Sequence, residues 1–446
     1  MLEPAHHADV VIVGAGVAGL SAAHQLTRAG VTTVVLEAAP YVGGRMSTEK
    51  VDGFRLDRIG QLLTTSYPEL RHTPGLDALV LRPFAPGVLV HSDGRHHRAV
   101  EPTGPRRARG ALTAARALAT APRGPRTAWT APRTTPLGGA LDQARLGAAL
   151  ARLAATHPKR LMTRPELPAA KALFSRGLPA RTVNGFLRPL LSALLCDPDL
   201  TTSSRCADLA LRSFARGRLC LPEGGAEVLP ELLAAALPPG TVHTGVRVTA
   251  VSTTSVTTAD HGEVSCRGVL LATDARAAAE LLPGLRVPPF HQVTVLHHAA
   301  PEPPLAEPAL LLDADRSGPV AHTAVISHVD PSRAPAGRAL ISSTVLGPPP
   351  DERAVLAHLA DLYGTSTAGW ETLAVHHTRD AVPAMPPPHD LRRPVRLLAG
   401  LYVCGAHRDT STVQGALYSG RRAARAALAD LGADPAYGTG ELPMAA

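Results

Sequence analysis

Three glycines and one acid near the start of the chain have the types and spacing of a nucleotide-binding site. Gly14, Gly16 and Gly19 follow the apolar run Val10–Val13, and Glu37 comes about twenty residues later. A Gly-x-Gly-x-x-Gly turn lets the backbone approach a pyrophosphate, and the N–H groups of the following helix bind its charge. The carboxylate of Glu37 can accept hydrogen bonds from both hydroxyls of a ribose and repels a 2′-phosphate. The motif therefore predicts a dinucleotide site that disfavours NADP.

The residues around this turn predict a βαβ unit. The apolar run before the turn favours a buried parallel strand, and the helix should begin at Val17 and end at Gly30, a typical C-cap. A second strand, VTTVVLE, ends on Glu37. Ala15 and Ala18 lie in the turn and at the helix start, so we expect both beside the same ligand.

A short glycine–arginine motif follows this unit. Gly43, Gly44 and Arg45 come directly after the second strand and its loop. In this setting the chain resembles a family of FAD-dependent oxidoreductases that includes flavin amine oxidases, protoporphyrinogen oxidases and phytoene desaturases. The resemblance implies FAD as the cofactor, with Gly43, Gly44 and Arg45 on the flavin side of its pyrophosphate. The forked cation of an arginine suits phosphate oxygens.

The resemblance continues through the middle of the chain. The stretch from Asp52 to Leu70 is similar to the family loop that runs past the flavin ring, with Gly60 as its close-approach glycine and Gln61 as a catalytic candidate. The sequence GRLCLPEGGAEVLPELLAAAL resembles the segment that leads back into the FAD-binding domain. The VRVTAV stretch is similar to the strand whose backbone contacts the adenine, which implies that Val248 lies there.

The C-terminal stretch YVCGAHRDTSTVQGALYSGRRAA is a second motif of the same family. A strand should end at Gly405, and a helix that starts near Thr412 and Val413 would point its N-terminus at the flavin pyrimidine. The positive end of the helix dipole favours negative charge on the reduced ring. Family members commonly carry an acid directly after the glycine. This chain has Ala406 there, and Asp409 is the candidate to replace that contact.

Some residues differ from those of the amine oxidases in the family. Those enzymes place a tyrosine where this chain has Thr412, and they use a lysine that holds a water at the flavin. The chain has three lysines, none of them in the strand-like region of residues 292–296. His407 and Arg408, beside the expected flavin-facing helix, are the remaining catalytic candidates. The desaturase-like branch is the closer resemblance.

The predicted fold class is α/β (α+β), a Rossmann-like FAD-binding domain with an inserted substrate domain of helices and sheet. Helical patterns alternate with Pro and Gly breaks through residues 83–214. The segment Phe186–Leu195 is apolar over most of a helix circumference, so we expect it either to be buried or to line a cavity that would suit an apolar substrate. The expected FAD-binding domain comprises residues 1–82, 215–287 and 395–432, the substrate domain comprises residues 83–214 and 288–394, and residues 433–446 form a tail.

Charge and composition limit the partners. Residues 81–145 hold eleven arginines and three acids, an excess equal to the whole net charge of +8. We expect there either a solvated basic face or peripheral contact with an anionic membrane, and no nucleic-acid binding, because aromatic residues are not interleaved.

The five cysteines and the paired histidines lack metal-ligand spacing, so we predict no metal. Scattered thiols, no signal-peptide pattern and no apolar run of about 20 residues favour a cytoplasmic protein, with or without that membrane contact.

The combined features predict an FAD-dependent oxidoreductase that removes a hydride from an apolar small molecule. The reaction would desaturate or oxidise a C–C or C–N bond of an isoprenoid or another secondary metabolite, and oxygen or a quinone would reoxidise the flavin. Three alternatives stay open. They are a flavin amine oxidase, a redox-neutral flavin-dependent isomerase, and a non-catalytic FAD- or lipid-binding protein.

Overall fold

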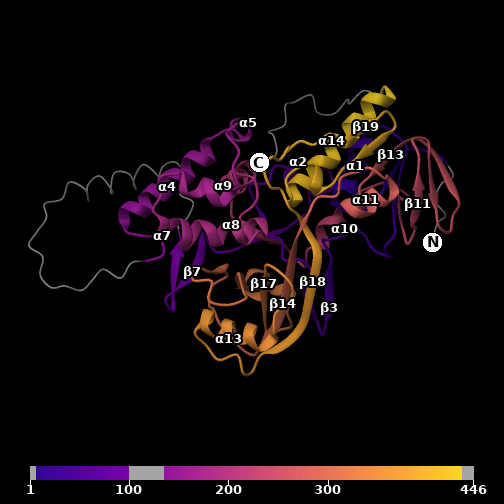
Figure 1. Ribbon diagram of the computed structural model, residues 1–446. Coiled ribbons are helices and arrows are strands. Elements are labelled where there is room, and N and C mark those ends of the chain that lie inside the picture. The colour runs from indigo at the N-terminus through magenta and orange to yellow at the C-terminus, as the bar shows by residue number, and fades with distance from the viewer. Residues whose placement is uncertain (1–6, 100–134, 434–446) are drawn as a thin grey trace, which may run out of the picture.

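An eight-stranded sheet joins the two ends of the chain to its middle (Figure 1). The computed structural model describes residues 7–99 and 135–433. The path through the sheet is β10-β2-β1-β13-β12-β11, with β20 beside β13 and β19 beside β20. The strands are β1 (His7–Val13), β2 (Thr33–Glu37), β10 (Val242–Thr244), β11 (Val248–Val251), β12 (Ser255–Thr258), β13 (Glu263–Leu271), β19 (Arg396–Leu398) and β20 (Leu401–Val403).

The parallel strands of this sheet end at one edge. Val13 of β1 is in register with Leu36 of β2 and with Leu271 of β13, and Leu271 is in register with Val403 of β20. These strand ends are buried, as expected for parallel strands covered on both faces. Since parallel strands share a direction, the loops that follow β1, β2, β13 and β20 meet at this edge.

The first and last helices pack directly on each other beside the sheet. They are α1 (Val17–Arg28) and α14 (Val413–Leu431) (Figure 1). A β-carbon on Gly420 of α14 would lie 2.0 Å from the carbonyl oxygen of Ala18, so only glycine permits this approach. The hydroxyl of Ser21 also donates to the carbonyl of Leu417 at 2.9 Å. The contact fixes the C-terminal helix against the N-terminal βαβ unit. Helices α10 (Val228–Ala235) and α11 (Ala275–Leu281) complete this part of the fold.

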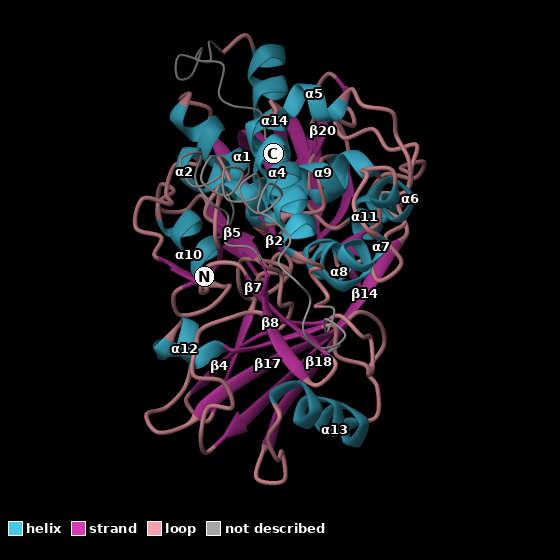
Figure 2. Cartoon of the chain, turned by 90° about the vertical axis from the view of Figure 1, so that its left-hand side faces the viewer, coloured by secondary structure: helices cyan, strands magenta, loops and turns pink. Residues whose placement is uncertain are grey.

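A second large sheet has seven strands. Helices and two large sheets together confirm the predicted α/β (α+β) fold class. The order of the second sheet is β18-β14-β17-β16-β15-β7-β8. Helix α13 (Glu352–Tyr363) lies at the opposite end of the molecule from α14 (Figures 1 and 2). The strands are β7 (Val88–Ser92), β8 (Arg95–Ala99), β14 (Phe290–Ala300), β15 (Leu311–Asp313), β16 (His322–Val325), β17 (Ala339–Val345) and β18 (Glu371–Pro383).

Short elements and a helical layer connect the two large sheets. Strands β3 (Thr48–Val51) and β4 (Phe54–Asp57) pair with each other, and β5 (Leu63–Thr64), β9 (Leu219–Pro222) and β6 (Leu81–Pro83) form a three-stranded sheet. The helices of this layer and the remaining short turns are α2 (Glu69–His72), α4 (Ala140–Ala155), α5 (Pro158–Met162), α6 (Ala169–Phe174), α7 (Ala180–Thr182), the π-turn η1 (Val183–Leu187), α8 (Arg188–Leu195), α9 (Ser204–Arg216), α12 (Ile326–Val329), and the 3₁₀ turns η2 (Pro331–Arg333) and η3 (Ala406–Arg408).

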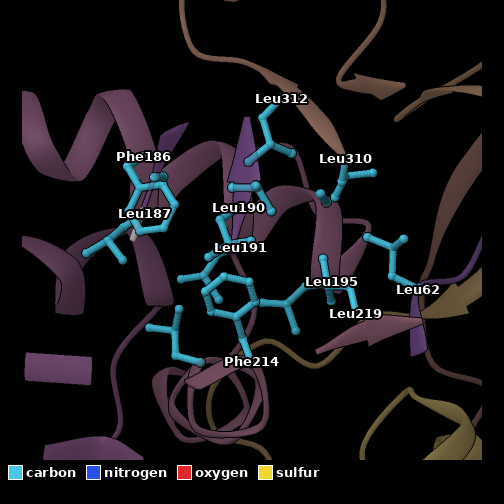
Figure 3. Close-up of a cluster of buried hydrophobic side chains, with 14 of the residues drawn as sticks. Leu62, Phe186, Leu187, Leu190, Leu191, Leu195, Phe214, Leu219, Leu310 and Leu312 are labelled. Atoms are coloured by element: carbon cyan, nitrogen blue, oxygen red, sulfur yellow. The ribbon is translucent and has the colours of Figure 1, made fainter. Parts of the chain in front are cut away.

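Of the two alternatives for the apolar helix, burial is the one observed. Phe186, Leu190 and Leu191 are fully buried and lie with Phe214 and Leu312 in one cluster (Figure 3). The helix packs into the core rather than along the substrate cavity because its apolar circumference faces other helices and the second sheet, which fill the space around it. A π-turn, η1, lies just before a proline in the first turn of α8.

Two regions that the sequence analysis singled out are described only in part by the structure. Most of the arginine-rich segment 81–145 lies outside the described residues, since residues 100–134 are not among them. The predicted tail, residues 433–446, also lies outside them except for its first residue. None of the described helices combines the length and the apolar character that a bilayer-spanning helix needs.

Replacing Leu190 with alanine should destabilise the protein strongly. Leu190 is fully buried, and a leucine-to-alanine change in a packed core costs about 2–5 kcal/mol through lost contacts and a residual cavity. Leu141, which is 56% exposed on α4, supplies the matched control, and Leu141→Ala should change stability by less than about 0.5 kcal/mol. Urea denaturation midpoints of the two variants provide the measurement. Equal midpoints would show that the apolar helix is not part of the core.

Stability should fall when the pH is lowered from 7.5 to 5.5. Burial lowers the pKa of several histidines to about 4, whereas the pKa of a histidine in the unfolded chain is about 6.5. The unfolded state therefore binds more protons over this interval, and each such histidine should lower the unfolding free energy by about 1 kcal/mol. The histidines are His297, His298, His322 and His389.

The opposite sign is expected of Asp409, whose pKa burial raises to about 7, and of Glu69, whose pKa burial also raises, but these are two groups against the four histidines and His407, whose pKa burial lowers to about 3. Urea midpoints at the two pH values test the net effect. An equal or higher midpoint at pH 5.5 would contradict the burial of neutral histidines.

Candidate functional site

A cavity of about 650 Å³ lies at the edge where the parallel strands end. Its wall includes the last residues of β1 and β2, the loop after β13 and the start of α14. Most of the residues singled out from the sequence line it, namely Gly14, Gly16, Ala18, Glu37, Gly43, Gly44, Arg45, Gly60, Gln61, Val248, Gly405, His407, Thr412 and Val413. Ala15, Gly19, Arg408 and Asp409 are not among the residues that line it.

The glycine turn after β1 forms a cradle that is open toward the cavity. Gly14 has a φ of +105°, and a β-carbon there would lie 3.0 Å from the backbone of Ala272. A β-carbon on Gly19 would lie 2.1 Å from the carbonyl oxygen of Gly14. Gly16 differs, since a β-carbon there would meet nothing within 4 Å. No side chain caps α1, so the N–H groups of its first turn remain for a ligand. The cradle therefore fits a diphosphate.

Glu37 is fixed at the end of β2 by backbone hydrogen bonds. One carboxylate oxygen accepts from the N–H of Ala15 at 2.8 Å and the other from the N–H of Ala39 at 2.9 Å. Each oxygen keeps a lone pair for a further donor. The carboxylate lines the cavity and is placed to accept hydrogen bonds from ribose hydroxyls.

The glycine–arginine motif packs against the cradle. The N–H of Gly43 donates to the carbonyl of Ala15 at 2.9 Å, and a β-carbon on Gly43 would lie 2.7 Å from the carbonyl oxygen of Met46. Nη1 of Arg45 donates to the carbonyl of Ala381 at 2.7 Å. Burial lowers the pKa of Arg45, and the nearby Asp274 opposes that shift. The guanidinium thus presents a positive charge to the cavity that it lines.

The C-terminal motif supplies the opposite wall. Gly405 has a φ of +133°, and a β-carbon there would lie 2.9 Å from the ring of His407. The hydroxyl of Thr412 accepts from the N–H of Gly415 at 3.1 Å and so caps α14. Because Thr412 and Val413 line the cavity, the positive end of the α14 dipole faces it.

The cavity also reaches the second sheet. Nε2 of Gln61 donates to the carbonyl of Ser411 at 3.0 Å, which ties the loop after β4 to the start of α14. A β-carbon on Gly60 would lie 3.4 Å from the hydroxyl oxygen of Thr344 in β17. Ile59, next to it, packs against an apolar cluster that includes Val295 of β14. This end of the cavity is therefore enclosed by aliphatic side chains.

His407 and Asp409, two candidate residues that follow Gly405, are both buried but have different neighbours. His407 is 7% exposed, and burial, with the charges of Arg408 and Arg45, lowers its pKa to about 3, so its ring is neutral at pH 7. Asp409 is buried and pairs with Nη1 of Arg422 at 3.2 Å. Its carboxylate is therefore directed to Arg422, and the proposed contact with the cofactor in place of Ala406 gains no support from its position.

Asp57 and Asp274 are acidic wall residues that the sequence analysis did not single out. Oδ2 of Asp57 pairs with Nη2 of Arg333 at 2.5 Å, and Oδ1 accepts from Thr48 and from the N–H of Ala226. Asp274 caps α11 through the N–H groups of the first turn. The sequence did offer a signal for Asp274, because it follows a predicted parallel strand and the loops after such strands form the edge of the sheet where ligands bind.

No metal-binding cluster of three or more His, Cys, Asp or Glu occurs among residues 7–99 and 135–433. The five cysteines are free and buried. Burial raises the pKa of the Cys196 thiol to about 12, which suppresses thiolate formation at pH 7. The residues that line the cavity offer charge and backbone donors, and no cysteine is among them.

Comparison with known proteins agrees with this geometry. The family described as flavin containing amine oxidoreductase matches residues 17–428. The chain is 50% identical over 68 residues to putrescine oxidase of Kocuria rosea, a match that covers 15% of this chain and 14% of that protein, so it spans a small part of the curated relative.

Solved structures match over nearly the whole chain. An oxidoreductase from Methanosarcina mazei superposes with a TM-score of 0.68 and 15% identity, over 93% of this chain and 99% of that one. A putrescine oxidase bound to putrescine superposes with a TM-score of 0.65 and 20% identity, over 95% and 99% of the two chains. These likenesses show a shared fold.

Replacing Gly16 with alanine should abolish tight FAD binding without unfolding the protein. The new methyl group meets no protein atom but enters the cradle, so we expect a dissociation constant raised about 100-fold or more, which corresponds to about 2.7 kcal/mol. Gly147→Ala in α4, also without neighbours within 4 Å, is the control and should bind FAD as the parent does. Titration of the apoprotein followed by flavin fluorescence provides the measurement. An unchanged FAD affinity in Gly16→Ala would show that this turn does not bind the diphosphate.

Proposed function

Because the chain belongs to the flavin-containing amine oxidoreductase family, its cofactor is FAD, and we propose that it removes a hydride from an apolar small molecule. The reaction would desaturate or oxidise a C–C or C–N bond. The observation that carries the proposal is the enclosure of the α14 end of the cavity by aliphatic side chains together with the dipole of α14. An isoprenoid or a similar secondary metabolite fits such surroundings.

The residues of the chain have distinct parts in this reaction. The turn at Gly14 and Gly16 binds the diphosphate, Glu37 holds the ribose, and Arg45 neutralises phosphate charge from the other side. When bound, FAD supplies the hydride acceptor. The N-terminus of α14, capped by Thr412, stabilises the negative charge that develops as the hydride is transferred.

The substrate side of the site excludes water. Ile59 in the cavity wall packs with Val293 and Val295 of β14, with Leu346 after β17 and with Ala381 of β18. The aliphatic part of this wall offers no acid or base, which suits the removal of a hydride from a carbon whose proton can leave to water. Among the polar residues that line the cavity, Asp57 is paired with Arg333, His407 is neutral at pH 7, and the amide of Gln61 is bound to the carbonyl of Ser411.

An amine oxidase remains the second candidate, since relatives named putrescine oxidase match the chain. Two features of the described wall do not support an amine substrate. Its lining contains no phenylalanine, tyrosine or tryptophan, which removes cation–π binding of an ammonium group. None of the three lysines, Lys50, Lys159 and Lys171, lines it either.

We also propose oxygen or a quinone as the electron acceptor and retain peripheral membrane contact through residues 81–145 as a proposal. The basic composition of that segment supports it through attraction to anionic lipid.

Anaerobic reduction tests the proposed function. Under argon, geraniol or geranic acid should bleach the visible absorbance of the bound flavin, whereas putrescine and cyclohexylamine should leave it unchanged. Reduction by dithionite controls for a reducible flavin. Bleaching by the amines would establish the amine-oxidase alternative. Conversion of the substrate without bleaching would indicate a redox-neutral isomerase. A flavin that dithionite reduces but no organic substrate reduces or transforms would favour a non-catalytic binding protein.

A further inference from the structure

A slot between α11 and β11 forms the end of the cavity beyond Glu37. The two elements lie next to each other (Figure 1). The N–H of Val246 donates to the carbonyl of Glu37 at 2.8 Å, which joins the start of this slot to the residue placed for the ribose. Val248 and Leu281 pack with Val246 in one apolar cluster, and all three line the cavity. Because the turn at Gly16 accounts for the diphosphate and α14 for the flavin, the slot is the part of the cavity left for the adenine.

A register shift turns the edge strand β11 toward this slot. The pairing of β11 with β12 changes register between Val248 and Ala250. Residues 247–249 all line the cavity, although neighbouring residues of a regular strand point to opposite faces. Irregularities of the β-bulge kind redirect side chains in this way and are common next to binding sites. Arg247 therefore reaches the same cavity as Val248.

Two side chains of opposite charge lie at the rim of the slot. Arg247 comes from β11 and Glu280 from α11, and both are exposed and line the cavity. Within the described part of the chain neither side chain forms a hydrogen bond or an ion pair, and the two do not pair with each other. Other acids of the wall differ, since Glu37, Asp57 and Asp274 have backbone or arginine partners. The carboxylate of Glu280 is therefore available to a ligand.

The position of Glu280 has no explanation in α11 itself. It lies in the last turn of that helix, where the negative end of the helix dipole disfavours a carboxylate. An acid at this position is better explained by a hydrogen-bond donor that the slot receives.

We propose that Glu280 and Arg247 recognise the adenine base of FAD. An ionised carboxylate only accepts hydrogen bonds, so Glu280 can bind the exocyclic amine, which is the conventional hydrogen-bond donor of the base. Arg247 carries a flat cation that can stack on the purine ring, and the apolar walls at Val248 and Leu281 suit the same ring. The inference concerns the cofactor rather than the substrate. It makes the protein selective for a flavin dinucleotide whose base carries an amino group.

Titration calorimetry of the full-length apoprotein tests the proposal with two ligands, FAD and flavin–purine dinucleotide, in which a hydrogen atom replaces the adenine amino group. The parent should bind FAD about fivefold more tightly than the analogue, as one net hydrogen bond provides, and Glu280→Ala should abolish this difference. Glu280→Gln keeps an acceptor oxygen and should retain part of it. Glu302→Ala, exposed and outside the cavity wall, is the control and should discriminate as the parent does.

Arg247→Ala should act differently from the glutamate variants. Because both ligands present a purine ring, it should weaken the binding of each by the same factor, about fivefold, and leave their ratio unchanged. Both side chains are exposed and without partners in the described residues, so these substitutions should leave the fold intact.

Three results would overturn the proposal. Equal affinity of the parent for the two dinucleotides, or an unchanged ratio in Glu280→Ala, would show that Glu280 does not bind the amine, and parent affinity in Arg247→Ala would show that Arg247 does not contact the ring. The titration needs no turnover, so its outcome is independent of the reduction experiment. Discrimination between the two ligands without flavin reduction by any substrate would defeat the proposed function alone, and reduction without discrimination would defeat this inference alone.

Discussion

The parallel register of β1, β2, β13 and β20 is the constraint on which the site depends. It brings the residues after Val13, Glu37, Leu271 and Val403 to one edge, although the first and the last of these positions are 390 residues apart in the sequence. The contact of Gly420 with Ala18 then fixes α14 against α1, so that two helix N-termini face one cavity. An elongated dinucleotide is the ligand that such an arrangement fits, with its diphosphate at the first helix and its ring at the second.

Positive charge is concentrated around this cavity, and it has two sources. Helix dipoles and backbone N–H groups act at the cradle and at Thr412, while the charges of Arg408, Arg45 and Arg393 act on His407. Two acids of the wall are already engaged, since Asp57 is paired with Arg333 and Asp274 caps α11. The positive charges and backbone N–H groups around the cavity can therefore stabilise anionic groups of a ligand and the negative charge that develops on a reduced flavin. It leaves the substrate end of the cavity aliphatic.

Most of the residues that local motifs predicted for the site line the cavity. The turn from Gly14 to Gly19 and the acid at Glu37 follow from steric and hydrogen-bonding rules that act within about 25 residues, so they can be recognised in the sequence. The helix around Phe186 shows the limit of such reasoning. An apolar circumference indicates that a helix is covered, and whether side chains or an open cavity cover it depends on elements from other parts of the chain. Nothing in the sequence indicated that Arg422, thirteen residues further on in α14, pairs with the carboxylate of Asp409.

The sequence alone determined the βαβ unit, many of the residues that line the cavity and the family to which the chain belongs, because these depend on backbone geometry that only particular residues allow. Tertiary structure decided which charges meet. The bridge from Arg422 to the carbonyls of Arg393 and Arg408, the burial of His389 and the close approach of Gly60 to β14 and β17 all join segments distant in sequence. Their electrostatic consequences depend on distance and desolvation in space, and neither quantity can be read from the order of residues.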